Sequence, residues 1–166
     1  AVDAVIVATD DERIAAAVRD PRGSGTAIAV MTDPDLPSGT DRVAAVARAC
    51  GWGEAVVVVN VQGDEPFVPP SLIDQAAALL AADPRADIAT LVTPGDSREE
   101  FLDPTVVKVV AADDGAALYF SRAPIPWPRD GASAGLTSQT CFHGAWRHVG
   151  LYAYRVGALM RITAMS

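Results

Sequence analysis

The chain has 166 residues, a length that suits one domain with its own hydrophobic core. Half of the residues are apolar, which argues against a disordered chain. The formal net charge of −8 argues against a nucleic-acid partner, because phosphate backbones are bound by basic surfaces. No apolar run is long enough to predict a transmembrane helix and nothing resembles a signal peptide, so we expect a cytoplasmic protein without a membrane partner.

The first half of the chain alternates short apolar runs with amphipathic segments. The apolar runs predict strands at Val5–Ala8, Ala27–Met31, Val56–Val61 and Ile88–Thr93. The amphipathic segments predict helices over Asp11–Arg19 (capped by Thr9 or Asp10), over Asp41–Cys50, and from Pro69 through Leu80. This alternation is typical of a parallel sheet covered by helices.

The second half of the chain follows a different pattern. Val106–Val110 and Ala117–Phe120 flank Asp113-Asp114-Gly115, which predicts a β-hairpin. The segment Ser121–Asp130 contains too many prolines for regular structure. Val149–Tyr154 is expected to be the last strand.

The most informative segment is Val56–Pro66, where an apolar run ends in an amide, a glycine and two acids. An uninterrupted apolar run predicts a central strand that is buried on both faces. Ligands of α/β folds bind beyond the carboxyl ends of such strands, so Gln62, Gly63 and Asp64 are candidate ligand contacts. Gly63 would permit positive φ or a close backbone approach, and Asp64 suits Mg²⁺ that carries phosphate oxygens. The alternative is a strand followed by an acidic turn.

A second candidate site is the loop SGTDR, residues Ser38 to Arg42, directly before a predicted helix. The free N–H groups of a helix N-terminus, together with the hydroxyls of Ser38 and Thr40 and the backbone of Gly39, could bind a phosphate or a base or ribose edge. Arg42 lies one turn further and could bind an anion with its planar guanidinium. The alternative is that Ser38 or Thr40 only caps the helix.

Two arginines, Arg122 and Arg129, flank a proline-rich segment that contains Trp127. Proline restricts φ, so this segment would present both guanidinium groups on a stiff loop, as suits a carboxylate or a phosphate. His148 could donate to a ligand hydroxyl, and Tyr152 lies along the same strand. The alternatives are a surface loop closed by Trp127 and a structural histidine.

Other chemistries find little support. Nucleophile motifs, the Rossmann fingerprint and the P-loop are absent from the sequence. The two cysteines and two histidines lack zinc-ligand spacing, and Cys50 falls on the apolar face of a predicted helix, where a packed thiol is expected. Mg²⁺ bound through Asp64 is the one metal that the sequence indicates.

Five segments together carry a family resemblance. They are Val5–Ile14, Ser38–Arg42, Val59–Pro66, Lys108–Asp130 and Arg147–Arg155. In this order they resemble the 3-deoxy-manno-octulosonate (Kdo) cytidylyltransferases, or CMP-Kdo synthetases, of Gram-negative bacteria. The resemblance implies an α/β fold with a Rossmann-like mixed, mostly parallel sheet of the glycosyltransferase-A (nucleotide-diphospho-sugar transferase) type, a β-hairpin excursion and a homodimer. It also implies the reaction CTP + Kdo → CMP-Kdo + pyrophosphate in lipopolysaccharide biosynthesis, with Mg²⁺ as cofactor.

The resemblance assigns roles to the candidate residues. Asp64 would bind Mg²⁺ and meet the α-phosphate, and Gln62 would lie between nucleotide and sugar, both as catalytic residues. The nucleotide side would be formed by Ser38, Gly39, Thr40 and Arg42. The sugar acid would meet Gln62, Arg122, Arg129, His148 and Tyr152.

The chain departs from the family pattern at both ends. It lacks the family's opening strand with its Arg- and Lys-rich loop, and the C-terminal part with a second metal-binding Asp. We therefore expect residues 1–166 to form a partial nucleotidyltransferase domain whose sheet has a central gap, and to be inactive and poorly stable alone. Two alternatives remain open: a cytidylyltransferase for another acidic sugar such as sialic acid, and a non-catalytic remnant that binds a nucleotide or a partner.

Overall fold

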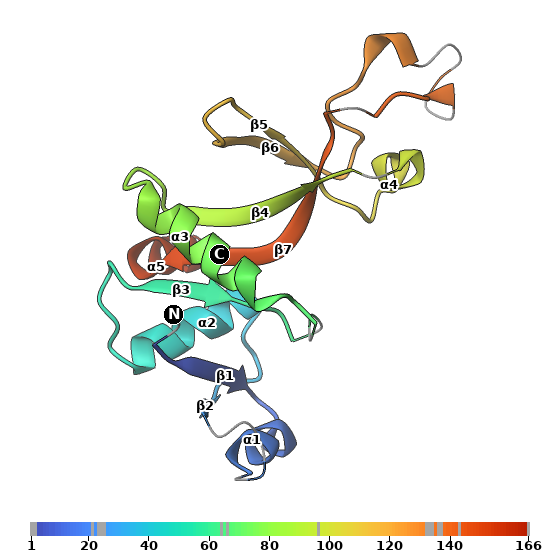
Figure 1. Ribbon diagram of the computed structural model, residues 1–166. Coiled ribbons are helices and arrows are strands. Elements are labelled where there is room, and N and C mark those ends of the chain that lie inside the picture. Colours follow the sequence, from blue (N-terminus) through green and yellow to red (C-terminus); the bar gives the residue numbers. More distant parts are fainter. Residues whose placement is uncertain are drawn as a thin grey trace. The chain divides into compact units, whose positions relative to one another are not determined.

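The computed structural model of the chain describes residues 3–20, 22, 26–63, 65, 67–95, 97–131, 135, 138–142 and 144–165. The chain divides into two compact units, unit 1 with Ala1–Ala89 and Leu151–Ser166, and unit 2 with Thr90–Gly150 (Figure 1). Strands β4 (Ile88–Pro94) and β7 (Trp146–Arg155) each continue along the chain from one unit into the other. A single domain over residues 1–166 therefore stays a prediction.

Apart from β4, which continues into unit 2, unit 1 contains the strands and helices that the first half of the sequence predicts. They are β1 (Val5–Thr9), α1 (Glu12–Arg19), β2 (Ala27–Met31), α2 (Gly39–Ala49), β3 (Val57–Asn60) and α3 (Pro70–Ala82). One expected detail is wrong: the N-cap of α1 is Asp11, not Thr9 or Asp10, because the Asp11 side chain accepts from the Arg13 N–H at 2.8 Å.

The strands form two sheets, and the expectation of a mostly parallel sheet is wrong for the pairs whose register is defined. β1 and β2 pair in parallel as a separate two-stranded sheet. In the five-stranded sheet, β3 pairs with β7, and β5 with both β6 and β7, all antiparallel. The expected arrangement does not form because β7, the last strand in the sequence, pairs with β3 as well as with β4.

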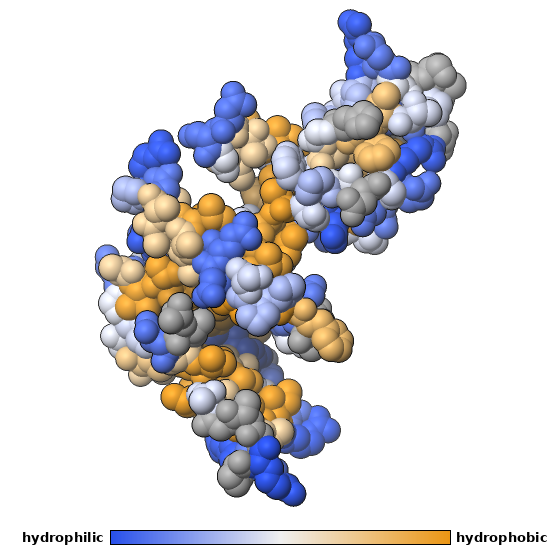
Figure 2. All heavy atoms as spheres, in the orientation of Figure 1, coloured by the Kyte–Doolittle hydropathy of each residue, from blue (hydrophilic) through white to orange (hydrophobic). Residues whose placement is uncertain are grey.

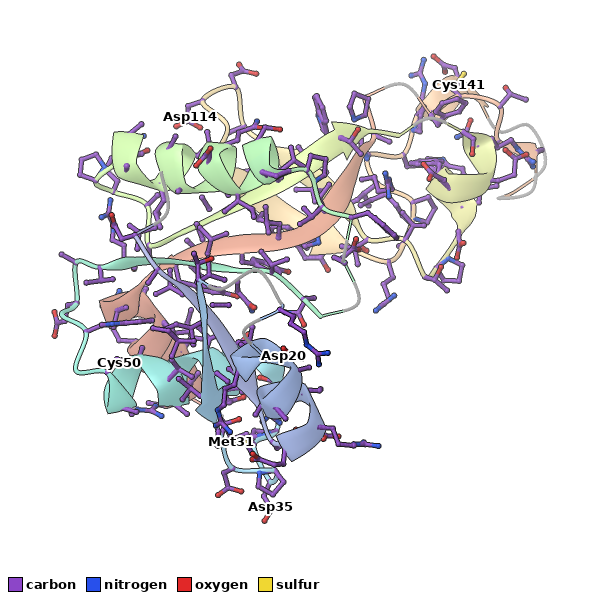
Figure 3. The ribbon with its side chains drawn as sticks, turned by 60° about the horizontal axis from the view of Figure 1, so that its bottom comes forward. Asp20, Met31, Asp35, Cys50, Asp114 and Cys141 are labelled. Atoms are coloured by element: carbon purple, nitrogen blue, oxygen red, sulfur yellow. The ribbon has the colours of Figure 1, made fainter. Side chains whose placement is uncertain are left out.

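Three strands of unit 1 have an open edge in the described part of the chain. β1 and β2 pair only with each other, and β3 pairs only with β7. β3 is therefore not the expected strand buried on both faces: its valines are partly buried and only Asn60 is buried. Figure 2 shows apolar side chains at the surface near β1 and β2. Val5 of β1 and Ile28 and Met31 of β2 are exposed, and Met31 is labelled in Figure 3.

The core of unit 1 lies between α2, β7 and α5 (Val156–Thr163). It consists of Ala44, Ala47, Tyr154, Val156 and Leu159. Helix α5 was not expected, although the apolar residues at its positions 156, 159 and 160 have helical spacing.

Cys50 is exposed, so the expectation of a packed thiol is wrong (Figure 3). It is the C-cap of α2, where its N–H donates to the Val46 carbonyl at 2.9 Å. Gly51 follows with a φ of 65°, which turns the chain away from the helix.

Unit 2 contains α4 (Arg98–Leu102), the strands β5 (Lys108–Ala111) and β6 (Ala117–Ser121), and a 3-10 turn at Arg129–Gly131. The predicted β-hairpin is confirmed by the antiparallel pairing of β5 and β6. Gly115, with a φ of 86°, supplies the positive backbone angle of its turn. In the described part of the chain, no helix has both the length and the apolar character needed to cross a membrane.

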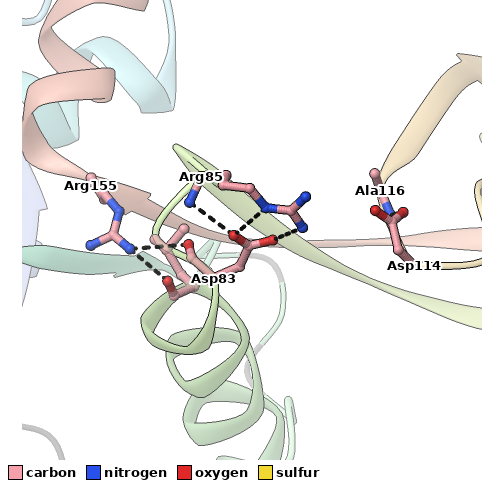
Figure 4. A network of polar contacts seen from close by, with 6 residues as sticks. Asp83, Arg85, Asp114, Ala116 and Arg155 are labelled. Carbon is pink, nitrogen blue, oxygen red and sulfur yellow. Dashed lines mark hydrogen bonds and ion pairs between the residues drawn. The ribbon is translucent and has the colours of Figure 1, made fainter.

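The C-terminal end of α3 is closed by the guanidinium of Arg155 (Figure 4). Its Nε donates to the carbonyl oxygen of Ala86 at 3.0 Å, and its Nη2 donates to those of Leu80 at 2.8 Å and Asp83 at 3.3 Å. The last carbonyls of a helix have no intrahelical donor, so this one side chain satisfies groups that would otherwise depend on water. Beside it, hydrogen bonds from Arg85 hold the pKa of the Asp83 carboxyl at about 2.

We expect Arg155→Gln to lower the free energy of unfolding by about 2–3 kcal/mol, because charge-assisted bonds to carbonyls in this partly buried place are lost. Urea denaturation followed by circular dichroism measures the change. The matched control is Arg22→Gln, which removes an exposed guanidinium that bonds only to the Asp20 carboxylate in the described structure. Equal loss in both variants would contradict the role given to Arg155.

Candidate functional site

The first turn of α2 is tied to the carboxyl ends of β1 and β2 by Arg42. Its Nη2 donates to the Asp10 carboxylate at 3.2 Å, and its Nη1 donates to the Thr32 hydroxyl. Asp10 and Thr32 directly follow β1 and β2, so their side chains mark the strand ends at which α/β folds bind ligands. The Asp10 carboxylate already binds the Arg42 guanidinium. An anionic ligand would therefore have to bind Arg42 beside Asp10 or in place of it.

Ser38 is the N-cap of α2, as one of the two interpretations of its loop predicts. Its Oγ accepts from the Asp41 N–H at 3.2 Å and also donates to the Asp41 carboxylate. Capping occupies only one N–H group of the first turn. The N–H groups of Gly39 and Thr40 have no acceptor within the helix and lie at its positive end.

Gln62 lies against the first residue of α2. A Cβ placed on Gly39 would come within 3.3 Å of Gln62 Oε1 and 3.4 Å of its Nε2. Gln62, which follows β3, therefore meets the N-terminus of α2. Gly63 shows neither a positive φ nor a close contact, so the predicted reasons for a glycine there are not seen. Asp64, the predicted Mg²⁺ ligand, lies outside the described residues.

Two tyrosines of β7 stand beside these residues. Tyr152 lies opposite Asn60 in the strand pairing and stacks on Tyr154 with ring centroids 5.8 Å apart. A hydrogen bond joins the Tyr154 side chain to Thr40 in the first turn of α2. Burial raises the pKa of both tyrosines, so their hydroxyls stay protonated and can donate at neutral pH.

Asn60 belongs to the same cluster and was not predicted. The residue is 7% exposed, and its Nδ2 is buried with no hydrogen-bond acceptor in the described part of the chain. An unsatisfied buried donor is unusual and calls for a functional or ligand-related explanation. The sequence did contain an indication of this residue's role, because the polar Asn60 directly follows the four valines Val56–Val59. Gly39, Thr40, Asn60, Gln62 and Tyr152 are called the α2 cluster below.

In unit 2, the guanidinium of Arg122 is bonded to backbone rather than to a carboxylate. Its Nη1 donates to the carbonyls of Pro104 and Thr105, each at 3.0 Å. Lys108 is 2% exposed, and its Nζ donates to two further carbonyls of the same loop, at residues 103 and 106, each at 2.7 Å. Burial lowers the pKa of Lys108. Arg122 and Lys108 thus hold the loop that precedes β5.

His148 and Arg129 have contrasting surroundings. The Nε2 of His148 lies 2.8 Å from the Thr90 hydroxyl, and its ring meets the edge of Phe120 at a centroid distance of 5.4 Å. Burial lowers the pKa of His148 and favours its neutral form. The Arg129 side chain is 92% exposed, with its Nε bonded to the Asp130 carboxylate at 2.8 Å.

Within the described residues, no group of three or more histidine, cysteine, aspartate or glutamate side chains is arranged to hold a metal ion. Magnesium in phosphoryl-transfer sites commonly takes one or two carboxylates, with water and phosphate oxygens as the other ligands. A site that depends on Asp64 and a bound nucleotide fits this pattern without a cluster of protein ligands.

Comparison with known proteins gives a consistent result. The family model for cytidylyltransferases matches residues 1–166. The 3-deoxy-manno-octulosonate cytidylyltransferase of Chromohalobacter salexigens is 52% identical over 157 residues, which cover 93% of this chain and 58% of the relative. The enzyme of the same name from Thioalkalivibrio sulfidiphilus is 48% identical over 162 residues, which cover 98% of this chain and 62% of the relative.

A solved structure is also similar. It is CMP:2-keto-3-deoxy-manno-octonic acid synthetase complexed with CTP, with a TM-score of 0.82 and 37% sequence identity. The match covers 99% of this chain and 61% of that structure. The chain therefore spans about 60% of the length of the relatives that it matches.

Tyr154→Phe tests the contact between β7 and α2. We expect it to lower the free energy of unfolding by about 1 kcal/mol, because one partly buried hydrogen bond to Thr40 is lost while the ring remains. Urea denaturation measures the change. Tyr119→Phe, on an exposed tyrosine of β6, is the matched control and should leave stability unchanged. A stability of Tyr154→Phe equal to that of this control would show that the contact contributes nothing.

His148 should make stability depend on pH. Its folded pKa lies below 6.5, so below pH 6.5 the unfolded chain binds more protons at this residue than the folded chain does. The histidine therefore costs no stability above pH 6.5 and progressively more as the pH falls below it. Denaturation at a series of pH values should show a smaller decrease between pH 7 and 5 for His148→Gln than for the unaltered chain. Parallel curves would contradict the assignment.

Proposed function

Because this chain belongs to the cytidylyltransferase family, we propose that the complete protein transfers CMP from CTP to Kdo, releasing pyrophosphate. The observation that carries the proposal is the α2 cluster, where the N-terminus of α2 meets Gln62 after β3, and where the Nδ2 of Asn60, opposite Tyr152, is buried without an acceptor among the described residues. Support comes from the similar structure, which is complexed with CTP, and from relatives named for Kdo.

The proposed reaction needs no covalent enzyme intermediate. The anomeric hydroxyl oxygen of Kdo forms a bond to the α-phosphorus, the bond from that phosphorus to the bridging oxygen breaks, and pyrophosphate leaves. Positioning and electrostatics then supply most of the catalysis, in agreement with the absence of a nucleophile motif from the sequence. When bound, Mg²⁺ would neutralise charge on the phosphate oxygens, and Asp64 is the residue proposed to hold it.

The α2 cluster is proposed to bind the nucleotide. The N–H groups of Gly39 and Thr40 can donate to phosphate oxygens at the positive end of the helix. Arg42 can add positive charge if it exchanges its contact with Asp10. Gln62, whose amide lies against Gly39, carries a donor and an acceptor and is proposed to lie between nucleotide and sugar.

The sugar acid is assigned to Arg122, Arg129, His148 and Tyr152. Arg122 uses Nη1 for its loop, so its Nε and Nη2 are the atoms proposed to meet the carboxylate. Arg129 has an exposed guanidinium that suits the same anion. A neutral His148 and a protonated Tyr152 suit sugar hydroxyls rather than a second charge.

We further propose a glycosyltransferase-A type, Rossmann-like fold, a cytoplasmic location, a role in lipopolysaccharide biosynthesis and a homodimer for the complete protein. The homodimer is supported by the exposed apolar side chains of β6, which are Leu118, Tyr119 and Phe120. Residues 1–166 alone are proposed to be inactive and weakly stable, because β1 and β3 keep open edges and the chain spans about 60% of its relatives.

Two other functions remain as alternatives. A cytidylyltransferase for another acidic sugar would use the same α2 cluster, and it is disfavoured by the names of the relatives. A non-catalytic remnant would bind the nucleotide without turnover. In the assay below, pyrophosphate release measured with Kdo alone and with sialic acid alone separates these functions: release with Kdo, release with sialic acid, or release with neither.

The deciding experiment measures pyrophosphate release by the complete protein with CTP, Mg²⁺ and Kdo. We expect Kdo-dependent release that falls by at least about a hundredfold in Asp64→Asn, because a neutral amide is a poor Mg²⁺ ligand. Asp74→Asn, the same change on an exposed position of α3, is the matched control and should keep full activity. No release with Kdo, or release that is indifferent to Asp64, would overturn the proposal.

A further inference from the structure

The side chain of Gln139 is 0% exposed, and both ends of its amide are bonded to backbone. Its Nε2 donates to the Pro128 carbonyl at 3.0 Å, and its Oε1 accepts from the Cys141 N–H at 3.0 Å. Arg98 of α4 donates through Nε to the carbonyl of Gln139 itself at 2.5 Å. A buried amide with both ends satisfied fixes the segments that it joins. Gln139 therefore ties the end of the proline-rich segment to Cys141.

Gly131 packs against the same amide. A Cβ at this position would lie 1.6 Å from Gln139 Oε1 and 2.8 Å from the Cys141 Cβ, so only a glycine fits. The Gly131 carbonyl also accepts from the Thr140 N–H at 3.0 Å and from its hydroxyl at 3.3 Å. The backbone of Gly131 is thus held by the segment that contains Gln139.

The held positions lie on both sides of Arg129 in the sequence. Pro128 precedes it and is bonded to Gln139, and Gly131 follows shortly after. Trp127, one residue further back, stacks on Phe101 with ring centroids 6.3 Å apart. The backbone around Arg129 is therefore fixed, while its guanidinium stays 92% exposed and open to a ligand.

We propose that Gln139 is a positioning residue that holds Arg129 in place for the carboxylate of the sugar acid. The inference rests on the proposed function, which supplies the anionic substrate. A guanidinium meets a carboxylate through two parallel N–H···O bonds, so affinity depends on its orientation. A backbone that is already fixed also reduces the entropy that binding must remove.

The test uses the complete protein and near-isosteric Gln139→Met, which removes both amide hydrogen bonds. We expect the KM for Kdo at saturating CTP to rise about tenfold, and the KM for CTP to change less than twofold. If Gln139 acts through Arg129, then in an Arg129→Ala background the same substitution should change the KM for Kdo less than twofold. An equal rise in both backgrounds, or no rise at all, would overturn the proposal.

A milder variant and a control complete the experiment. Thr140→Val removes only the 3.3 Å hydroxyl bond to Gly131, and it should raise the KM for Kdo two- to threefold even if Gln139→Met fails to fold. An unchanged KM in Thr140→Val would count against the proposal. Gln75→Met, on an exposed position of α3, should leave both KM values unchanged. If the proposed function itself is wrong, the unaltered protein will release no pyrophosphate with Kdo. That result is distinct from an unchanged KM in the variants.

Discussion

The register between β3 and β7 is the constraint on which unit 1 depends. It runs antiparallel from Val57 opposite Arg155 to Asn60 opposite Tyr152. Opposite residues of a pair share one face of the sheet, so this register brings Tyr154 into the core with α2 and α5 and Tyr152 beside Asn60. A slip of one residue would turn both tyrosines to the other face. The core and the candidate nucleotide site thus depend on the same hydrogen bonds.

Several cations of this acidic chain bind backbone carbonyls instead of carboxylates. Arg155 closes the end of α3, and Lys108 and Arg122 hold the loop before β5. Carbonyls at helix ends and in irregular loops need donors when they are removed from water, and a guanidinium or ammonium can serve more than one of them. A basic residue in a conspicuous motif can therefore have a structural role, and Arg122 combines such a role with the ligand role proposed for it.

The two proposed binding regions differ in how they are prepared for a ligand. In the described part of the chain, the buried Nδ2 of Asn60 in the α2 cluster has no hydrogen-bond partner, and the N–H groups of Gly39 and Thr40 have no acceptor within the helix. Around Arg129, Gln139 instead bonds to the carbonyl of Pro128 and to the N–H of Cys141, while the Arg129 side chain is exposed. The first arrangement leaves hydrogen-bonding capacity for a polar ligand, and the second holds a charge where a carboxylate can reach it.

The sequence by itself determined the strands and helices of the first half, the β-hairpin and the motifs of the site, because each is encoded by periodicity or turn residues over a few neighbouring positions. It did not determine what depends on distant partners. Only the tertiary structure decided that β7 pairs antiparallel with β3, that Asp10 and Thr32 meet Arg42, and that the Nδ2 of Asn60 is buried without an acceptor among the described residues. Such contacts join residues far apart in the chain, and local patterns do not specify which partners folding brings together.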